Sequence, residues 1–442
     1  MRKRFVASCL TVSFLMITCS LTSALWAAGP APKEIKIGAS LAITGVLSKE
    51  WGPVAVKYMR ALETLTNEQG GLFIKEYNQR IPVSLILYDD GSSPDRSVEL
   101  YEKLATGDKV DFFLGPAASP LLIKASTVAE KYEIPMVGQE GNSPYIYARG
   151  FKWLVGTDTP APEWCQGHHQ FLKYLMDKKA IPTLKTIAIL YEDNPPHRDI
   201  AWGAEHSVGI SGTKLVYKEA VPPDTTDFSA TIIKLKNVQP DVLFACMFIG
   251  TASNLIKQSY EMDFKPFDFH APHVTLADPS WYQKIGGKIA EGLTGMCTVA
   301  PFKKGNVKMW KRSLEMCNLG PFDFGCAGSR FLGWEVLMKG IESAGTLDRP
   351  KVMEAIKKLD YESLHGRMAF RFNAEIGGMK TDGMGIKPVY IGQWQKGEVK
   401  TLWPLELANG EFKQREEAVS LLLVRNILAP GGLYPPGLQK GM

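Results

Sequence analysis

Two short motifs in the first third of the chain carry groups suited to binding an anion. Ser119-Pro120 follows the apolar run Phe112–Leu114, and Asn142-Ser143-Pro144 follows a second apolar run, Ile134–Val137. A serine before a proline at the start of a helical pattern is typical of an N-cap and first helical residue, where backbone N–H groups lack helical partners. Such groups bind carboxylates and phosphates. Ordinary capping is the alternative for either motif alone, but the pair at neighbouring strand ends predicts a ligand site.

Two other clusters carry residue types that bind metals, His270-Ala-Pro-His273 and Cys165-Gln-Gly-His168-His169. Structural zinc usually needs four ligands in a recognisable spacing, and neither cluster has a visible second half-site. We therefore expect no metal and no cofactor. The chain also lacks a P-loop, a G-x-S-x-G elbow, an H-E-x-x-H motif, an EF-hand loop and a C-x-x-C motif, so we expect that it is not an enzyme.

Apolar runs of strand length alternate with helical patterns, which predicts parallel sheets covered on both faces. The strands of the first set are expected at Ile35–Leu41, Val83–Tyr88, Asp111–Leu114, Ile134–Val137 and Lys152–Val155, and those of the second at Thr186–Tyr191, Lys214–Ala220, Asp241–Met247, Phe267–His270 and Leu293–Val299. Helices are expected at Val54–Glu68, Arg330–Ala344 and Pro350–Leu359, and a hairpin at Val389–Trp394 with Val399–Trp403. The fold class is therefore α/β, with two doubly wound parallel-sheet lobes joined by a multi-strand hinge.

Domain boundaries follow from breaks in this pattern and from the chain length, which exceeds what one core accommodates. We expect a signal peptide at 1–28, lobe 1 at 33–157 plus 299–373, lobe 2 at 158–298 plus 374–428, and a C-terminal coil at 429–442. The leader has three cations, no acid, an apolar stretch and small residues before Gly29, as a cleaved secretory signal requires; an uncleaved anchor is the alternative.

Charge and cysteine usage narrow the class of protein. The 442-residue chain has a net charge of +5, and removal of residues 1–28 leaves 48 basic against 46 acidic residues, or +2. No basic block remains to suggest nucleic acid. Five cysteines remain after the leader, so at least one thiol is unpaired. The spacing leaves open whether Cys317 joins Cys326 in an oxidising compartment.

Several motifs in order resemble one family. Ile35-Lys-Ile-Gly-Ala-Ser-Leu-Ala-Ile-Thr-Gly45, Asn67-Glu-Gln-Gly-Gly-Leu72, Tyr88-Asp-Asp-Gly-Ser-Ser-Pro94, Asp227-Phe-Ser229 and Ala290-Glu-Gly-Leu293 resemble the substrate-binding proteins of branched-chain amino-acid type ABC importers, the leucine/isoleucine/valine-binding family with the periplasmic binding protein fold type I. The resemblance covers about residues 33–400. It implies two lobes joined by three hinge strands, a ligand enclosed between them, and delivery to a membrane permease.

The resemblance also implies the ligand-binding residues. Trp51 falls where the family has an aromatic wall, Ser119 where a hydroxyl holds the ligand carboxylate, and Glu140 and Asn142 on the loop that contacts the ligand head group. On lobe 2, Phe248 falls near an aromatic contact, and the loop from Glu192 to Arg198 faces the cleft. Trp281 and Tyr282 are also expected near the cleft.

One position departs from the family pattern. Where amino-acid binders have an acidic residue for the ligand ammonium, this chain has His273, and an unpaired buried cation is costly. Glu140 is an alternative partner for an ammonium. We therefore prefer a carboxylate with an apolar or aromatic body, and we expect His273 to contact it.

The sequence thus predicts a monomeric periplasmic receptor that delivers a small carboxylate-bearing ligand to an ABC-type permease, without nucleic acid and with no membrane contact except through the permease. Two alternatives stay open. One is a periplasmic sensor subunit that docks on a signalling membrane protein, and the other is an exported enzyme using Glu140 and His273. The sequence names neither the ligand nor the partner.

Overall fold

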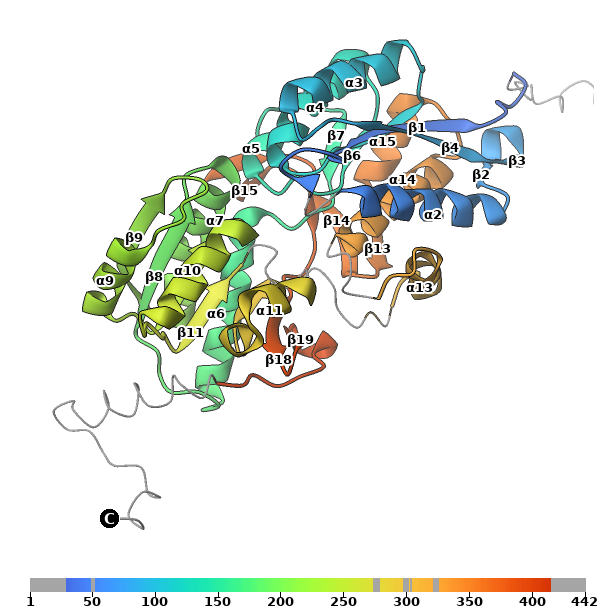
Figure 1. Ribbon diagram of the computed structural model, residues 1–442. Helices are drawn as coiled ribbons and strands as arrows, with labels where there is room; N and C mark the ends of the chain where they lie inside the picture. The colour runs from blue at the N-terminus through green and yellow to red at the C-terminus, as the bar shows by residue number, and fades with distance from the viewer. Residues whose placement is uncertain are drawn as a thin grey trace, which may run out of the picture.

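The structure is a computed structural model that describes residues 29–48, 52–272, 279–296, 302, 304–320 and 326–414. It has two α/β lobes, the first built around an eight-stranded sheet and the second around a seven-stranded sheet. Figure 1 shows the first lobe in blue, cyan and orange and the second in green and yellow, with the red hairpin on the second. The expected signal peptide at 1–28 and the expected coil at 429–442 lie outside the described residues.

The first sheet is mostly parallel and has the order β13-β14-β17-β7-β6-β5-β1-β4. Its parallel part reads β4-β1-β5-β6-β7, so the strand order reverses between β1 and β5. Its strands are β1 (Ile35–Leu41), β4 (Val83–Asp89), β5 (Phe112–Leu114), β6 (Met136–Gly138), β7 (Leu154–Gly156), β13 (Asp360–Ser363), β14 (Gly366–Arg371) and β17 (Met384–Ile386).

The second sheet has the order β19-β18-β12-β11-β10-β8-β9 and repeats the same parallel arrangement. Its strand order reverses between β8 and β10, as it does between β1 and β5 in the first lobe. Its strands are β8 (Thr186–Glu192), β9 (Lys214–Val221), β10 (Val242–Cys246), β11 (Asp268–Ala271), β12 (Thr294–Met296), β18 (Ile391–Gln395) and β19 (Glu398–Trp403).

Helices cover both faces of each sheet because consecutive strand residues point to opposite sides. In β5, Phe112 packs with α2 and α14, whereas Phe113 packs with α3, α4 and α5. The helices of the first lobe are α2 (Pro53–Glu68), α3 (Pro94–Thr106), α4 (Ser119–Tyr132), α5 (Pro144–Tyr147), α13 (Val307–Met316), α14 (Ala327–Ala344) and α15 (Arg349–Lys357).

In the second lobe, α6 and α7 pack on one face of the sheet, and α9 and α10 pack against the apolar side chains of the other face. The helices are α6 (Ala161–Asp177), α7 (Pro195–His206), α8 (Val208–Ser211), α9 (Ser229–Val238), α10 (Ile249–Glu261), α11 (Pro279–Ile285) and α12 (Gly287–Ala290). Smaller elements are the pairs β2 (Leu72–Ile74) with β3 (Gln79–Ile81) and β15 (Ala374–Ile376) with β16 (Met379–Thr381), and the 3-10 turns η1 (Lys75–Tyr77) and η2 (Leu405–Leu407).

The predicted elements are confirmed, with most ends shifted by one or two residues. The predicted strand Leu293–Val299 is described only to Met296. The hairpin turns at Lys396-Gly397 and pairs with β12 of the second lobe, as expected. One boundary shifts: β17 joins the first sheet although it follows residue 373. We therefore propose that the chain returns to the second lobe after Ile386 rather than at residue 374.

The thiols of Cys317 and Cys326, whose pairing the sequence leaves open, are buried and are not joined to each other. Among the helices of the described residues, none has the length and apolar composition needed to cross a bilayer.

Candidate functional site

A cavity of about 220 Å³ lies between the two lobes, at the edges where their parallel strands end. Loops that follow β1, β4, β5 and β6 supply its wall on the first lobe, and loops that follow β8 and β10 supply part of its wall on the second. Open α/β sheets bind ligands at this edge, where the strand order reverses. The lining residues are Val46, Leu47, Ser92, Pro94, Ala118, Ser119, Pro120, Leu121, Glu140, Asn142, Asp158, Trp164, Pro196, Phe248, Met296, Cys326 and Ser329.

Hydroxyl and amide groups of the first lobe form one side of the cavity. The Ser119 hydroxyl donates to Asn142 Oδ1 at 3.1 Å and accepts from the backbone N–H of Ser143 at 3.2 Å. In α4, the N–H of Leu122 bonds to Ala118 O, so the N–H groups of Ser119 and Leu121 precede the helical ladder at the cavity wall. The start of α4 therefore offers first-turn N–H groups to a ligand acceptor, whereas the Ser119 hydroxyl would have to turn away from Asn142 Oδ1 to donate to it.

The N-cap of α4 differs from the prediction. Ala118 is the N-cap, with φ of +63°, and Ser119 is the first helical residue. The prediction of a serine N-cap was wrong because the backbone turn at Ala118 starts the helix one residue earlier. The second motif begins as expected, with Ser143 as the N-cap of α5 and Pro144 as its first residue.

Each of the two carboxylates that the described residues contribute to the cavity wall is paired with a buried cation. Arg330 on α14, with no exposed surface, donates to Glu140 Oε2 at 2.7 Å and to Gln139 Oε1 at 3.2 Å. Lys387 lies 3.2 Å from Asp158 Oδ1, and this pair joins two segments that pass between the lobes. These partners balance the negative charge of the cavity wall, because a buried charge is tolerated only when it is compensated.

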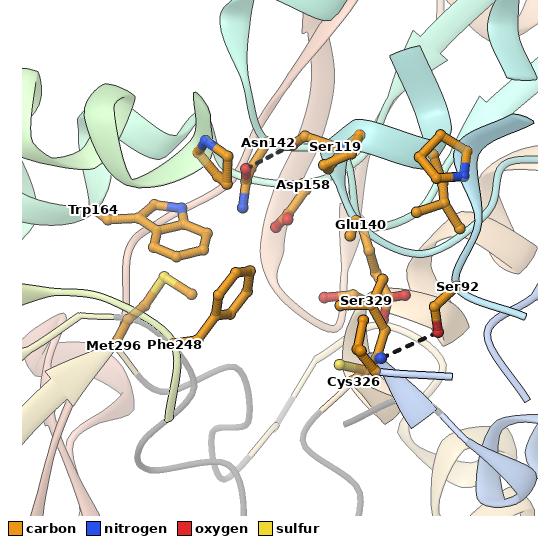
Figure 2. Close-up of a pocket in the computed structure, with 17 residues that line it drawn as sticks. Ser92, Ser119, Glu140, Asn142, Asp158, Trp164, Phe248, Met296, Cys326 and Ser329 are labelled. Carbon is orange, nitrogen blue, oxygen red and sulfur yellow. Dashed lines mark hydrogen bonds between the residues drawn. The ribbon is translucent and has the colours of Figure 1, made fainter. Parts of the chain in front are cut away.

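The second lobe contributes an apolar wall. Figure 2 shows Trp164, Phe248 and Met296 together on the side opposite Glu140 and Asp158. Trp164 comes from α6 and is held by a bond from its indole N–H to Thr159 O at 2.9 Å. Phe248 is the N-cap of α10, and Met296 ends β12. The first lobe therefore supplies polar groups set among apolar residues such as Val46 and Leu121, and the second lobe supplies an aromatic wall, which suits a ligand with a small polar head and an apolar body.

Four of the six predicted ligand-binding residues, Ser119, Glu140, Asn142 and Phe248, line this one cavity. Trp51 and His273 lie outside the described residues, so their roles stay predictions. Trp281 and Tyr282, which were expected near the cleft, are not among the described residues that line this cavity. Trp281 donates to Ser253 Oγ at 2.7 Å, and both rings pack against Trp394 of the hairpin.

Sequence reasoning missed Trp164, Met296, Asp158 and Arg330. The first two resemble ordinary core residues of a helix and a strand. Asp158 lies in a segment that the sequence marked only as a break, and Arg330 is 190 positions from Glu140, so no local spacing connects them.

The described residues of the histidine and cysteine clusters, Cys165, His168, His169 and His270, lie in the core of the second lobe. His168 Nε2 is 2.6 Å from Asp268 Oδ2, and its ring stacks on that of His270 at 3.7 Å. His169 contacts Ser211 Oγ and Ala204 O. These contacts indicate that the three histidine side chains are polar residues of the protein core.

The fold and the cleft define a two-lobed solute-binding protein. A family profile described as periplasmic binding protein matches residues 34–398. The chain belongs to this family.

Two curated relatives match this chain in sequence along most of their length. The chain is 21% identical to Leu/Ile/Val-binding protein homolog 7 of Brucella melitensis over 90% of this chain and 98% of that protein. It is 24% identical to the leucine-, isoleucine-, valine-, threonine- and alanine-binding protein of Pseudomonas aeruginosa over 77% of this chain and 86% of that protein.

Two solved structures illustrate different ligands on this fold. A Streptococcus pneumoniae branched-chain amino acid transporter substrate binding protein in complex with isoleucine has a TM-score of 0.66 at 19% identity, covering 84% of this chain and 100% of that chain. A Rhodopseudomonas palustris (R. palustris) solute binding protein in complex with benzoate has a TM-score of 0.64 at 17% identity, covering 84% and 95%.

The coarse function follows from the family. The protein is a solute-binding component of the ABC-transporter type, and its family and fold are those of transport binding proteins rather than enzymes. The family implies a periplasmic or extracellular location.

Proposed function

We propose that this protein captures a small carboxylate-bearing ligand with an apolar, preferably aromatic, body and delivers it to the permease of an ABC importer. The observation that carries the proposal is the placement of the polar groups of the cavity wall at the start of α4 and in the loop after β6, across from the apolar residues Trp164, Phe248 and Met296. The carboxylate would accept from the first-turn N–H groups and, in place of Asn142 Oδ1, from the Ser119 hydroxyl, and the body would lie against the aromatic wall.

The charge pairs support a ligand without an ammonium group. An α-amino acid needs a carboxylate to compensate its cation, and the two carboxylates of the described cavity wall, Glu140 and Asp158, already have Arg330 and Lys387 as partners. The zwitterion as a whole adds no net charge, but its ammonium would have to share a carboxylate that is already paired, whereas the carboxylate of either ligand can bind at the start of α4.

The size of the cavity supports a small solute. At about 220 Å³ it is smaller than the roughly 300–1,000 Å³ typical of sites for drug-sized molecules. Because both lobes line it, a ligand that contacts both stabilises the closed arrangement more than the open one. Closure of the two lobes around the ligand would also generate the form that a permease recognises.

Thermal-shift measurements on residues 29–442 test the ligand class with benzoate, leucine and a short aliphatic acid. A ligand at 100 times its Kd stabilises the folded state by about 2.7 kcal/mol. We expect benzoate to raise the melting temperature and leucine to leave it unchanged. A response to leucine alone would contradict the preferred ligand class, while still fitting a transport receptor.

We also propose that residues 1–28 are a cleaved secretory signal. Expression of the full chain in a Gram-negative host, followed by amino-terminal sequencing of the periplasmic protein, tests this. A start near Gly29 is expected, and recovery of the intact chain in membranes would contradict it.

A further inference from the structure

A buried carboxylate behind the aromatic wall contacts two loops of the second lobe. Glu192 ends β8, and its side chain is almost fully buried. Its Oε2 atom accepts from the Phe248 backbone N–H at 3.3 Å and from Asn194 Nδ2 at 3.1 Å, and lies 3.1 Å from His197 Nδ1. The carboxylate thereby joins the loop after β8 to the loop after β10.

Residues at the ends of both loops line the cavity. Pro196 lies in the first turn of α7, which follows the loop after β8, and Phe248 is the N-cap of α10, at the end of the loop after β10. The ring of His197 packs edge-on against the ring of Phe248, with centroids 4.5 Å apart. Glu192 therefore contacts the backbone of one lining residue and the histidine that supports its ring.

The protonation states fit this arrangement. Burial would raise the pKa of the Glu192 carboxyl, but the groups of His197, Thr251 and Phe248 that bond to it outweigh burial and lower that pKa. Burial lowers the pKa of His197, although Glu192 opposes the shift. A neutral His197 ring has one N–H, and the adjacent carboxylate favours the tautomer that carries it on Nδ1.

We infer that Glu192 is a positioning residue of the ligand cavity, which fixes the relative placement of Phe248 and Pro196 through its carboxylate. This inference rests on the proposed function of the cavity. Ligand sites keep their geometry when the side chains that form them are held by further hydrogen bonds behind them. Without the carboxylate, the two loops would lose their common acceptor, and Phe248 would no longer have one fixed position.

Two variants of similar size separate the effect of losing the hydrogen-bond acceptor from the effect of losing side-chain volume. Glu192→Gln keeps an oxygen that can accept from the Phe248 N–H, whereas Glu192→Leu fills the space without an acceptor. Glu219→Leu is the matched control, because Glu219 lies on β9 of the same sheet, pairs with Lys234 at 2.8 Å and does not line the cavity.

Hydrogen exchange of the ligand-free protein is the first measurement. In Glu192→Leu we expect the Phe248 amide to exchange at least about tenfold faster, since a hydrogen bond to a charged acceptor is lost. Glu192→Gln is expected to stay within about threefold of the unaltered protein, and Glu219→Leu to match it. Unchanged exchange in Glu192→Leu would overturn the inference, whatever the protein binds.

Calorimetric titration with benzoate and with leucine is the second measurement. For the probe that the unaltered protein binds, we expect Glu192→Leu to weaken affinity by about tenfold or more, with recovery in Glu192→Gln. Faster exchange with unchanged affinity would also overturn the inference. If the unaltered protein binds neither probe, the proposed ligand class fails, and the exchange experiment alone decides the role of Glu192.

Discussion

His169 should make the second lobe sensitive to acid. Its ring has no exposed surface, with Nδ1 2.7 Å from Ser211 Oγ and Nε2 3.0 Å from Ala204 O. The neutral ring satisfies both contacts by donating from Nε2 to the carbonyl and accepting at Nδ1. Burial, with a smaller effect of His168, lowers the pKa of His169 from its ordinary 6.5 to about 4.

The direction of the pH effect follows from that shift. The unfolded chain takes up a proton near pH 6.5, while the folded protein resists it until about pH 4. The stability contributed by the neutral ring is therefore complete above pH 6.5 and is lost as the pH falls. Integrating the proton difference gives a loss of about 2 kcal/mol at pH 5 and about 3 kcal/mol at pH 4.

Urea unfolding followed by circular dichroism at pH 8, 5 and 4 tests this in the unaltered protein and in His169→Gln. Glutamine can donate to Ala204 O and accept from Ser211 but cannot take up a proton. The other histidines are the same in both proteins, so the difference between the two isolates the effect of His169. His206→Gln, at an exposed histidine, is the control and should follow the unaltered protein. Equal losses of stability on acidification in His169→Gln and the unaltered protein would refute the reasoning.

Three further outcomes follow from the cleft. Arg330→Met should lower the free energy of unfolding by about 3–5 kcal/mol, because it removes the cation that pairs with the buried Glu140 carboxylate, and adding Glu140→Gln should restore part of that loss in denaturant titrations. Ala118→Gly should raise the free energy of unfolding by about 1 kcal/mol, since the φ of +63° is costly for alanine. A lower free energy of unfolding in this variant would contradict the explanation from backbone strain. If His273 contacts the ligand carboxylate, affinity should strengthen from pH 8 to pH 5 and His273→Ala should lose this trend; equal pH profiles would reject the role.

Local patterns in the sequence were sufficient to predict most of the strands and helices. β1 was predicted with both of its ends, because an apolar run between turn residues is specified by neighbours along the chain. The Ser119 and Asn142 loops were predicted to meet for a general reason, since the carboxyl ends of neighbouring parallel strands lie at one edge of a sheet. The structure joins them by the bond between Ser119 and Asn142.

The cavity itself depends on contacts that no local pattern contains. Trp164 reads as the apolar face of a helix, and only the packing of the second lobe turns it toward Phe248. Arg330 reaches Glu140 because α14 returns to the first lobe after the chain has built the second. Strand and helix formation is governed by sterics and burial between near neighbours. Which side chains share a cavity is decided by sheet pairing and lobe contacts between residues far apart in the chain, and therefore only by the tertiary structure.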